Sequence, residues 1–208
     1  MLVSTSNNIS YGQEILRKLI HLSSLWMPVT IYFLEYKYAV ILFSLVFFIV
    51  FLSEILRLNS PFFRKIFNYF FGNILREHET NDSAKFAGAF YVCFAVLIAL
   101  ALFPKIIAVT AISIMLISDT ASALIGRRLG KTKILSKSLE GLLAFIIFGL
   151  FTVSFIYYFT NQHLSFLIAG YIGAIVAGFI ELISKDILKI DDNITIVLSC
   201  AVVMFLLI

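Results

Sequence analysis

The stretch from Ser118 to Gly141 combines an acid inside an apolar segment with a short cationic loop. The acid is Asp119, and the loop contains Gly126 and Gly130. Its cations are Arg127, Arg128, Lys131, Lys133 and Lys137. Arginine and lysine side chains bind phosphate oxygens, and glycines let backbone N–H groups approach them closely. The stretch therefore suits a polyphosphate and its metal ion.

Asp119 is the most informative single residue, because an ionisable side chain within a membrane span is costly and usually functional. On a helix it shares one face with Ser122 and Ala123, where small side chains permit close packing. The alternative is a purely structural ion pair with Arg127 or Arg128 across the following turn. We expect Asp119 to be a catalytic residue and a metal ligand.

Further acids follow where later apolar segments end or begin. Glu181 ends one segment, and Asp192 with Asn193 opens the next. Carboxylates of this kind suit Mg²⁺, so we expect Asp119, Glu181 and Asp192 to be its ligands. An ordinary helix cap is the alternative for an acid at a helix start.

Other candidate residues lie in the first half of the chain. They are His21, Glu54, Arg57 and Lys85. Glu54 and Arg57 stand three residues apart, so a helical ion pair without further function is the alternative for them.

Composition places these residues in a membrane protein. The chain has 208 residues, 61% of them hydrophobic and 13% charged, with a mean hydropathy of +1.02. Soluble domains are about half apolar and about one quarter charged. We expect one integral membrane domain over residues 1–208. Its net charge of +4 fits cytoplasmic loops better than nucleic-acid binding.

Apolar runs predict an all-α polytopic bundle of about seven transmembrane helices. The expected spans are 19–35, 38–56, 86–104, 105–125, 141–160, 163–181 and 193–208. Between the second and third, Pro61–Leu75 has apolar residues at helical spacing and cations on the other side. This pattern predicts an amphipathic helix in the cytoplasmic interface, either as a surface anchor or as a wall where a lipid enters.

The cations orient this bundle. With a cytoplasmic N-terminus, all sixteen Lys and Arg residues except Lys37 and Lys105 fall on the cytoplasmic side. An odd number of spans then puts the C-terminus outside. Because the candidate residues also gather on the cytoplasmic side, a one-sided site is favoured over a transporter, which must open to both faces.

A family resemblance rests on several of these motifs together. They are Asp119, Gly126-Arg127, Gly130-Lys131, Lys137-Ser138-Leu139-Glu140-Gly141, Glu181 and Asp192-Asn193-Ile194-Thr195-Ile196. The pattern resembles the dolichol, phytol and farnesol kinases and the fungal CTP-dependent diacylglycerol kinases, within the phosphatidate cytidylyltransferase-like superfamily. The chain departs from it at Val197, where these kinases often have proline.

The resemblance implies phosphoryl transfer from CTP, with Mg²⁺, to a membrane lipid alcohol. In this scheme the nucleotide is bound by Arg127, Arg128, Gly130, Lys131, Lys137 and Asn193. The residues expected to take part in catalysis are Asp119, Lys137, Glu140 and Asp192. A phosphatidate cytidylyltransferase and a non-catalytic transporter or scaffold are the alternatives. We expect no nucleic-acid partner and a bacterial inner-membrane location. A homodimer is compatible with the sequence, which leaves the oligomeric state open.

Overall fold

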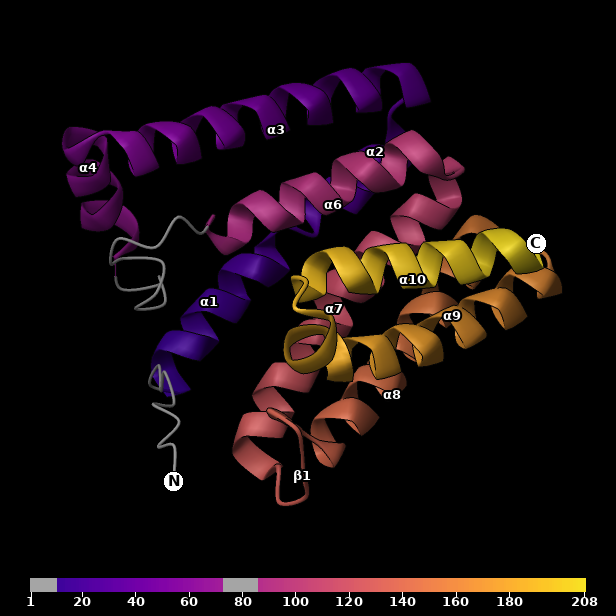
Figure 1. The fold of residues 1–208 in the computed structure, drawn as a ribbon. Coiled ribbons are helices and arrows are strands. Elements are labelled where there is room, and N and C mark those ends of the chain that lie inside the picture. Colours follow the sequence, from indigo (N-terminus) through magenta and orange to yellow (C-terminus); the bar gives the residue numbers. More distant parts are fainter. Residues whose placement is uncertain (1–10, 73–85) are drawn as a thin grey trace.

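The apolar segments fold into helices in a computed structural model that describes residues 11–72 and 86–208 (Figure 1). The helices are α1 (Tyr11–Ser23), α2 (Trp26–Phe33), α3 (Tyr36–Asn59), α4 (Pro61–Phe71), α6 (Gly88–Leu102), α7 (Lys105–Leu129), α8 (Leu139–Thr160), α9 (Leu164–Ile183) and α10 (Asp192–Leu207). A π-helical turn, η1 (Ser184–Leu188), extends α9. The strands β1 (Lys133–Ile134) and β2 (Lys137–Ser138) form a small antiparallel hairpin.

Helix α7 forms the centre of the bundle. It packs against α8, α10, α2, α1 and α6, and 78% of its most apolar stretch is buried. A helix that is apolar on all sides is buried either among other helices or in lipid, and α7 lies among other helices. This central position is also the reason why Asp119, in the second half of α7, is buried within the protein.

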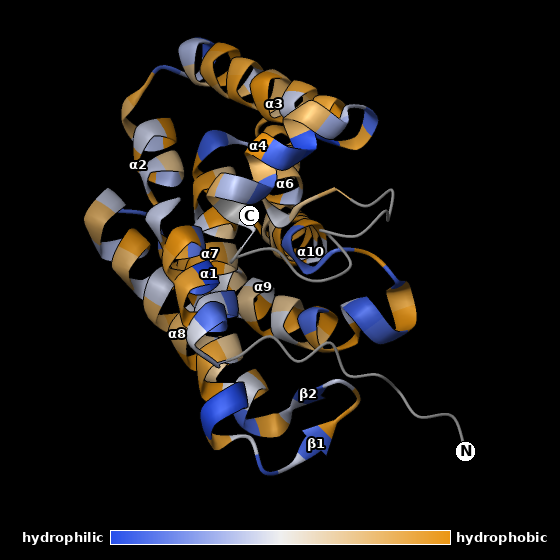
Figure 2. Ribbon diagram, turned by 90° about the vertical axis from the view of Figure 1, so that its left-hand side faces the viewer, coloured by the Kyte–Doolittle hydropathy of each residue, from blue (hydrophilic) through white to orange (hydrophobic). Residues whose placement is uncertain are grey.

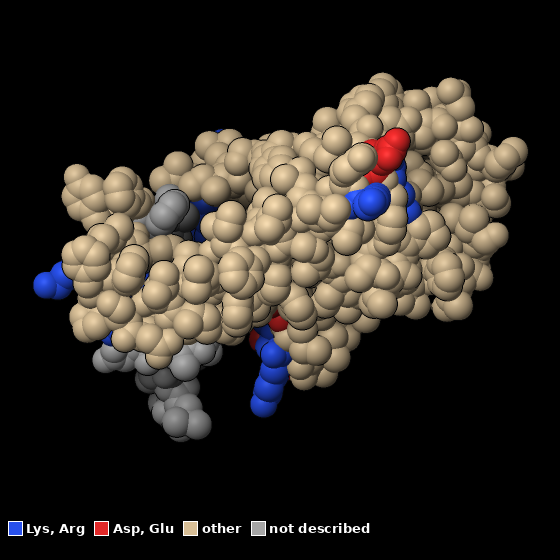
Figure 3. Space-filling view, turned by 90° about the horizontal axis from the view of Figure 1, so that it is seen from above, with Lys and Arg blue, Asp and Glu red and all other residues tan. Residues whose placement is uncertain are grey.

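The structure confirms an all-α membrane protein. Among the described residues, four helical segments are long and apolar enough to cross a membrane, namely α3, α7, α8 and α9 with η1. The apolar helices α6 and α10 are shorter. Most of the face that Figure 3 presents consists of side chains other than Lys, Arg, Asp and Glu. The prediction of seven spans is thus not confirmed by helix length.

The first predicted span is divided into two short helices. Helix α1 ends at Ser23, and α2 begins at Trp26. Pro28 explains the break, because it has no N–H and its ring would clash with the carbonyl of Ser24 in a continuous helix. The Ser24 carbonyl instead accepts a hydrogen bond of 2.8 Å from the N–H of Met27. Proline at the third position of α2 fits the first turn of a new helix.

Helix α4 follows α3 directly and is amphipathic. Phe62, Phe63, Ile66 and Phe70 are exposed, whereas Phe67 is half-buried. Exposed apolar side chains on one helix suit a membrane interface. The predicted helix over Pro61–Leu75 thus ends at Phe71, and residues 73–75 lie outside the described residues.

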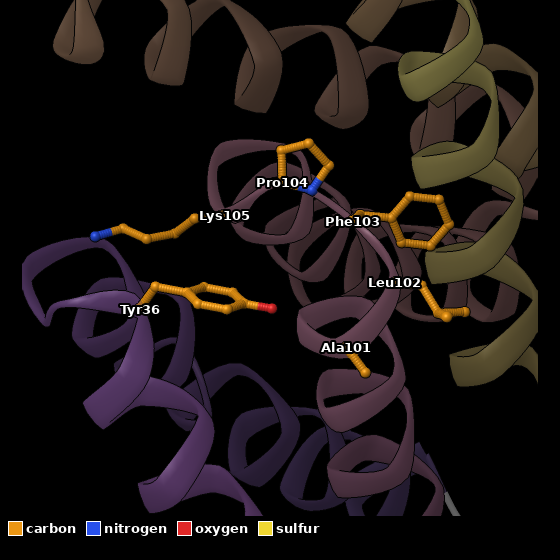
Figure 4. A pocket seen from close by; sticks show the side chains of 6 residues that line it. All are labelled: Tyr36, Ala101, Leu102, Phe103, Pro104 and Lys105. Carbon is orange, nitrogen blue, oxygen red and sulfur yellow. The ribbon is translucent and has the colours of Figure 1, made fainter.

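The end of the bundle where α6 meets α7 carries a hollow (Figure 4). Its volume is about 440 Å³. Its lining residues are Tyr36, Ala101, Leu102, Phe103, Pro104 and Lys105. The Lys105 ammonium donates a hydrogen bond of 2.7 Å to the Leu34 carbonyl. Because this set contains no acid and its cation is already bound to the backbone, the hollow offers little for phosphate chemistry.

A buried ion pair joins α3, α4 and α6. The Glu54 Oε2 atom lies 2.7 Å from a terminal nitrogen of Arg57 and accepts a hydrogen bond of 3.1 Å from the N–H of Ala87. The Arg57 guanidinium lies over the Phe67 ring, 5.3 Å from its centroid. Glu54 and Arg57 are only 2% and 3% exposed, so the pair links three helices within the protein.

Replacing Glu54 by alanine should lower the free energy of unfolding by about 3–5 kcal/mol, because it removes the carboxylate that balances a buried guanidinium. Chemical unfolding in detergent, followed by circular dichroism, measures this change. Glu35→Ala is the matched control, since Glu35 is exposed at the start of the same helix. We expect it to change stability by less than about 0.5 kcal/mol. Equal effects of the two substitutions would contradict a structural role for the pair.

Candidate active site

Three acids from three helices meet at one point of the structure. Asp119 comes from α7, Glu181 from α9 and Asp192 from the start of α10. One carboxylate oxygen of each lies within 4.8 Å of the other two. All three side chains are buried. Carboxylates this close repel one another strongly, so the cluster requires cations beside it.

Lysine side chains supply these cations. The Lys18 ammonium forms an ion pair with Asp119, and Lys137 forms one with Glu181. Lys137 Nζ also lies 3.5 Å from the Asp192 carboxylate. Lys185, from η1, places its Nζ 2.8 Å from the same Asp192 oxygen. Each acid therefore faces at least one ammonium group.

The donor set fits a divalent cation. Buried carboxylate oxygens are the ligands that Mg²⁺ takes in proteins, together with substrate phosphates. Within the described residues, Glu181 Oε2 is buried and has no hydrogen-bond partner. A buried carboxylate oxygen without a partner is costly, and a metal ligand is one role that would explain it.

Burial and charge act in opposite directions on Lys137. Burial disfavours its charged form, but the carboxylates of Glu181, Asp192 and Asp119 outweigh this and raise the pKa of Lys137 above its ordinary value. The side chain therefore stays positively charged at neutral pH. Burial and the neighbouring Asp192 charge raise the pKa of Asp191 to about 6.

The Asp191 carboxylate caps α10. It accepts hydrogen bonds of 3.0 Å from the Asn193 backbone N–H and 2.7 Å from the Asn193 side chain. Asp191 is thus an ordinary helix cap, which is the alternative that the sequence offers for an acid at a helix start. The cap fixes the first turn of α10, where Asp192 projects into the acid cluster.

The hairpin between α7 and α8 positions Lys137. Its polar residues stand out against the apolar helices in Figure 2. Ser138 caps the start of α8, and its hydroxyl accepts a hydrogen bond of 3.2 Å from the N–H of Gly141. The Glu140 carboxylate accepts hydrogen bonds from the N–H groups of Lys131 and Thr132, at 2.9 and 3.1 Å. These contacts hold the loop on the start of α8.

The glycines of this loop allow a close approach of backbone segments. A Cβ atom added to Gly130 would lie 2.1 Å from the Gly126 carbonyl oxygen and 2.6 Å from the Ser138 hydroxyl. A Cβ on Gly126 would lie 3.3 Å from the Cα of Gly141. The structure therefore gives these glycines a role in packing α7 against the start of α8, and the expected contact of Gly130 with phosphate stays a prediction.

The acid cluster opens into a cavity of about 760 Å³. The predicted site residues that line it are His21, Glu54, Asp119, Arg127, Lys137, Glu181, Asp192 and Asn193. Within the described part of the chain, the predicted residues that do not line it are Arg57, Arg128, Gly130, Lys131 and Glu140. Lys85 lies outside the described residues.

Some residues at the site were not among those predicted. Lys18 and Lys185 contact the acids, and Glu14 lies 3.4 Å from a terminal nitrogen of Arg127. A signal was available for the two lysines, because each lies one helical turn from a predicted residue, His21 or Glu181. His21 itself places Nε2 3.6 Å from the Asp119 carboxylate.

Known proteins are similar in sequence to this chain over most of its length. The chain is 30% identical over 183 residues to an uncharacterized protein of Rickettsia prowazekii, covering 88% of this chain and 89% of that protein. It is also 30% identical over 174 residues to CTP-dependent diacylglycerol kinase 1 of Schizosaccharomyces pombe, covering 76% of this chain and 75% of that enzyme. The chain belongs to the CTP-dependent diacylglycerol kinase family.

A further member of this family extends the match. CTP-dependent diacylglycerol kinase 1 of Saccharomyces cerevisiae is 28% identical over 206 residues, covering 88% of this chain and 69% of that enzyme. No family model and no solved structure matches the chain. Membership in a family of lipid kinases agrees with an integral membrane protein whose buried acids and cations lie around one cavity.

Proposed function

We propose that the chain is a CTP-dependent lipid kinase, which transfers the γ-phosphate of CTP to the hydroxyl group of a membrane lipid alcohol. The alcohol is diacylglycerol, as the names of the two fungal relatives suggest, or an isoprenoid alcohol. One observation carries the proposal. The buried cluster of Asp119, Glu181 and Asp192, with Lys137 beside it, faces a cavity that also has an apolar side.

Asp119, Glu181 and Asp192 would hold Mg²⁺, which when bound neutralises charge on the triphosphate. Phosphoryl transfer depends mainly on positioning and on charge neutralisation. Lys137 and Arg127 line the cavity and would contact the phosphate oxygens, while Asn193 would contact the nucleotide. The bond between the γ-phosphorus and its bridging oxygen breaks, a phosphate ester forms on the lipid, the hydroxyl loses its proton, and CDP leaves.

The same proposal places the site at the cytoplasmic face of a bacterial inner membrane. The cations around the cavity lie at one end of the helices, whereas Lys37 and Lys105 lie in the first turns of α3 and α7 at the other end. Such an asymmetry is typical of cytoplasmic loops. Helices α6 and α10, and α1 with α2, would complete the seven crossings despite their short length. The rickettsial relative supports a bacterial membrane.

Two labelled forms of CTP test the proposal on purified protein with Mg²⁺ and diacylglycerol or prenyl alcohols. We expect label from the γ-position to enter the lipid phase and label from the α-position to remain in CDP. Entry of α-label into lipid after addition of phosphatidate, with release of pyrophosphate, would favour a cytidylyltransferase. If neither label entered lipid, the transporter or scaffold alternative would replace the kinase.

A further inference from the structure

The cavity at the acid cluster has a second side that is apolar. Its lining there consists of Met27 from α2, Val50 from α3, Phe67 from α4, and Val92 and Cys93 from α6. Apart from Glu54 on α3, the charged lining residues come from other elements, namely α1, α7, the hairpin, the end of α9 with η1, and the start of α10. One continuous cavity thus joins a polar region suited to phosphates with a region suited to hydrocarbon.

The apolar side extends from the helix ends toward the middle of the bundle. Helix α6 begins at Gly88, so Val92 and Cys93 lie about 6–8 Å farther along its axis, at 1.5 Å per residue. Val50 lies one turn inward from Glu54 on α3. In a chain that crosses a membrane, this direction leads from the headgroup level into the hydrocarbon core.

Glu54 lies at the boundary between the polar side and the apolar side of the cavity. Its carboxylate is also bound by groups of the protein. Its Oε2 atom is bound by Arg57 and by the N–H of Ala87. The Phe67 ring, which lines the apolar side, rests on the Arg57 guanidinium. The buried pair thus holds α4 and the start of α6 in place as walls.

Two of these walls, α3 and α4, expose much apolar surface to the outside of the bundle. Only 17% of the most apolar stretch of α3 is buried, compared with 78% for α7. Helix α4 exposes aromatic side chains next to this region. In a membrane, the outer surface of α3 and α4 would therefore lie against hydrocarbon chains.

We infer that the apolar side of the cavity is a subsite for the hydrocarbon chain of the lipid alcohol, with Ala89, Val92 and Cys93 of α6 as one wall. This inference rests on the proposed function. A chain in this subsite places its hydroxyl group at the boundary with the acid cluster. The cavity volume of about 760 Å³ lies within the range of roughly 300–1,000 Å³ that is typical of ligand sites.

The test uses a lipid alcohol with a photoreactive diazirine near the polar end of its chain, on the full-length protein in nanodiscs. We expect mass spectrometry to find the crosslink on the α6 segment that contains Ala89, Val92 and Cys93. Ala89 is an exposed alanine in this wall, so Ala89→Phe can narrow the subsite without entering the packed core. Ala101→Phe is the control, because Ala101 is exposed at the far end of the same helix.

Ala89→Phe should raise the KM for the lipid and lower the crosslink yield about tenfold, the loss expected when roughly two methylene groups lose apolar surroundings. The KM for CTP should stay unchanged, and Ala101→Phe should behave as wild type. Crosslinks outside the apolar lining, with an unchanged lipid KM in Ala89→Phe, would overturn the subsite while phosphoryl transfer continued. Absence of transfer with every alcohol would overturn the proposed function instead, and the crosslink site would still test the subsite.

Discussion

Replacing Asp119 by asparagine should lower kcat for phosphoryl transfer about 10²–10³-fold, the range seen when one electrostatic contact to the transition state is removed. Asparagine keeps the shape of the side chain but removes the negative charge that a metal ion requires. Steady-state kinetics with γ-labelled CTP and lipid measure the effect. An unchanged kcat would contradict the role of Asp119 as a metal ligand.

Stability must be separated from catalysis in this variant, because Asp119 also balances the buried Lys18 ammonium. We expect Asp119→Asn to unfold at a lower temperature, since a buried charge without its counter-charge is costly. The double variant Lys18→Met with Asp119→Asn removes both charges and should recover much of this stability. Its activity should stay as low as that of the single variant. If activity recovered together with stability, the pair of Lys18 and Asp119 would have a structural role and no catalytic one.

Removal of the Lys137 charge has the second largest expected effect. Lys137→Gln should lower kcat/KM for CTP about 10²-fold, because the ammonium lies beside Glu181 and Asp192 in the cavity and would contact phosphate there. Its raised pKa keeps it charged across the neutral range, so raising the pH from 6 to 8 should not reproduce the loss.

Lys131→Gln is the matched control in the same loop between α7 and α8. Lys131 is exposed and does not line the cavity within the described residues, so we expect its replacement to change kcat/KM less than about threefold. Both substitutions remove one cation from the loop. The comparison therefore distinguishes an effect of the position of the ammonium group in the cavity from a general effect of positive charge. Equal losses in the two variants would favour a diffuse electrostatic role for the whole loop.

The sequence predicted the acid cluster because each of its members carries a local signal. Asp119 is an acid in an apolar segment, and Glu181 and Asp192 lie at the ends of later segments. With the orientation that the cations indicate, these ends fall on the same side as Asp119. The sequence could therefore indicate one shared site, whereas the separation of 4.8 Å or less required the structure.

The cations of the site were harder to predict, because their partners depend on how distant helices cross. Lys18 contacts an acid 101 positions later in the chain. Lys131 and Lys137 lie in the same short loop, yet only Lys137 lines the cavity. The loop composition indicated phosphate binding but could not distinguish the two. The break before α2 was also missed, although Pro28 provided a physical reason for it.

The most direct test of the central hypothesis measures Mn²⁺ binding to the purified protein by electron paramagnetic resonance, with and without CTP. Mn²⁺ takes the same oxygen ligands as Mg²⁺. We predict one bound Mn²⁺ in the presence of CTP, with affinity strongly reduced in Asp119→Asn, Glu181→Gln and Asp192→Asn. Unchanged Mn²⁺ and CTP binding in all three variants would contradict a metal–triphosphate site at these acids.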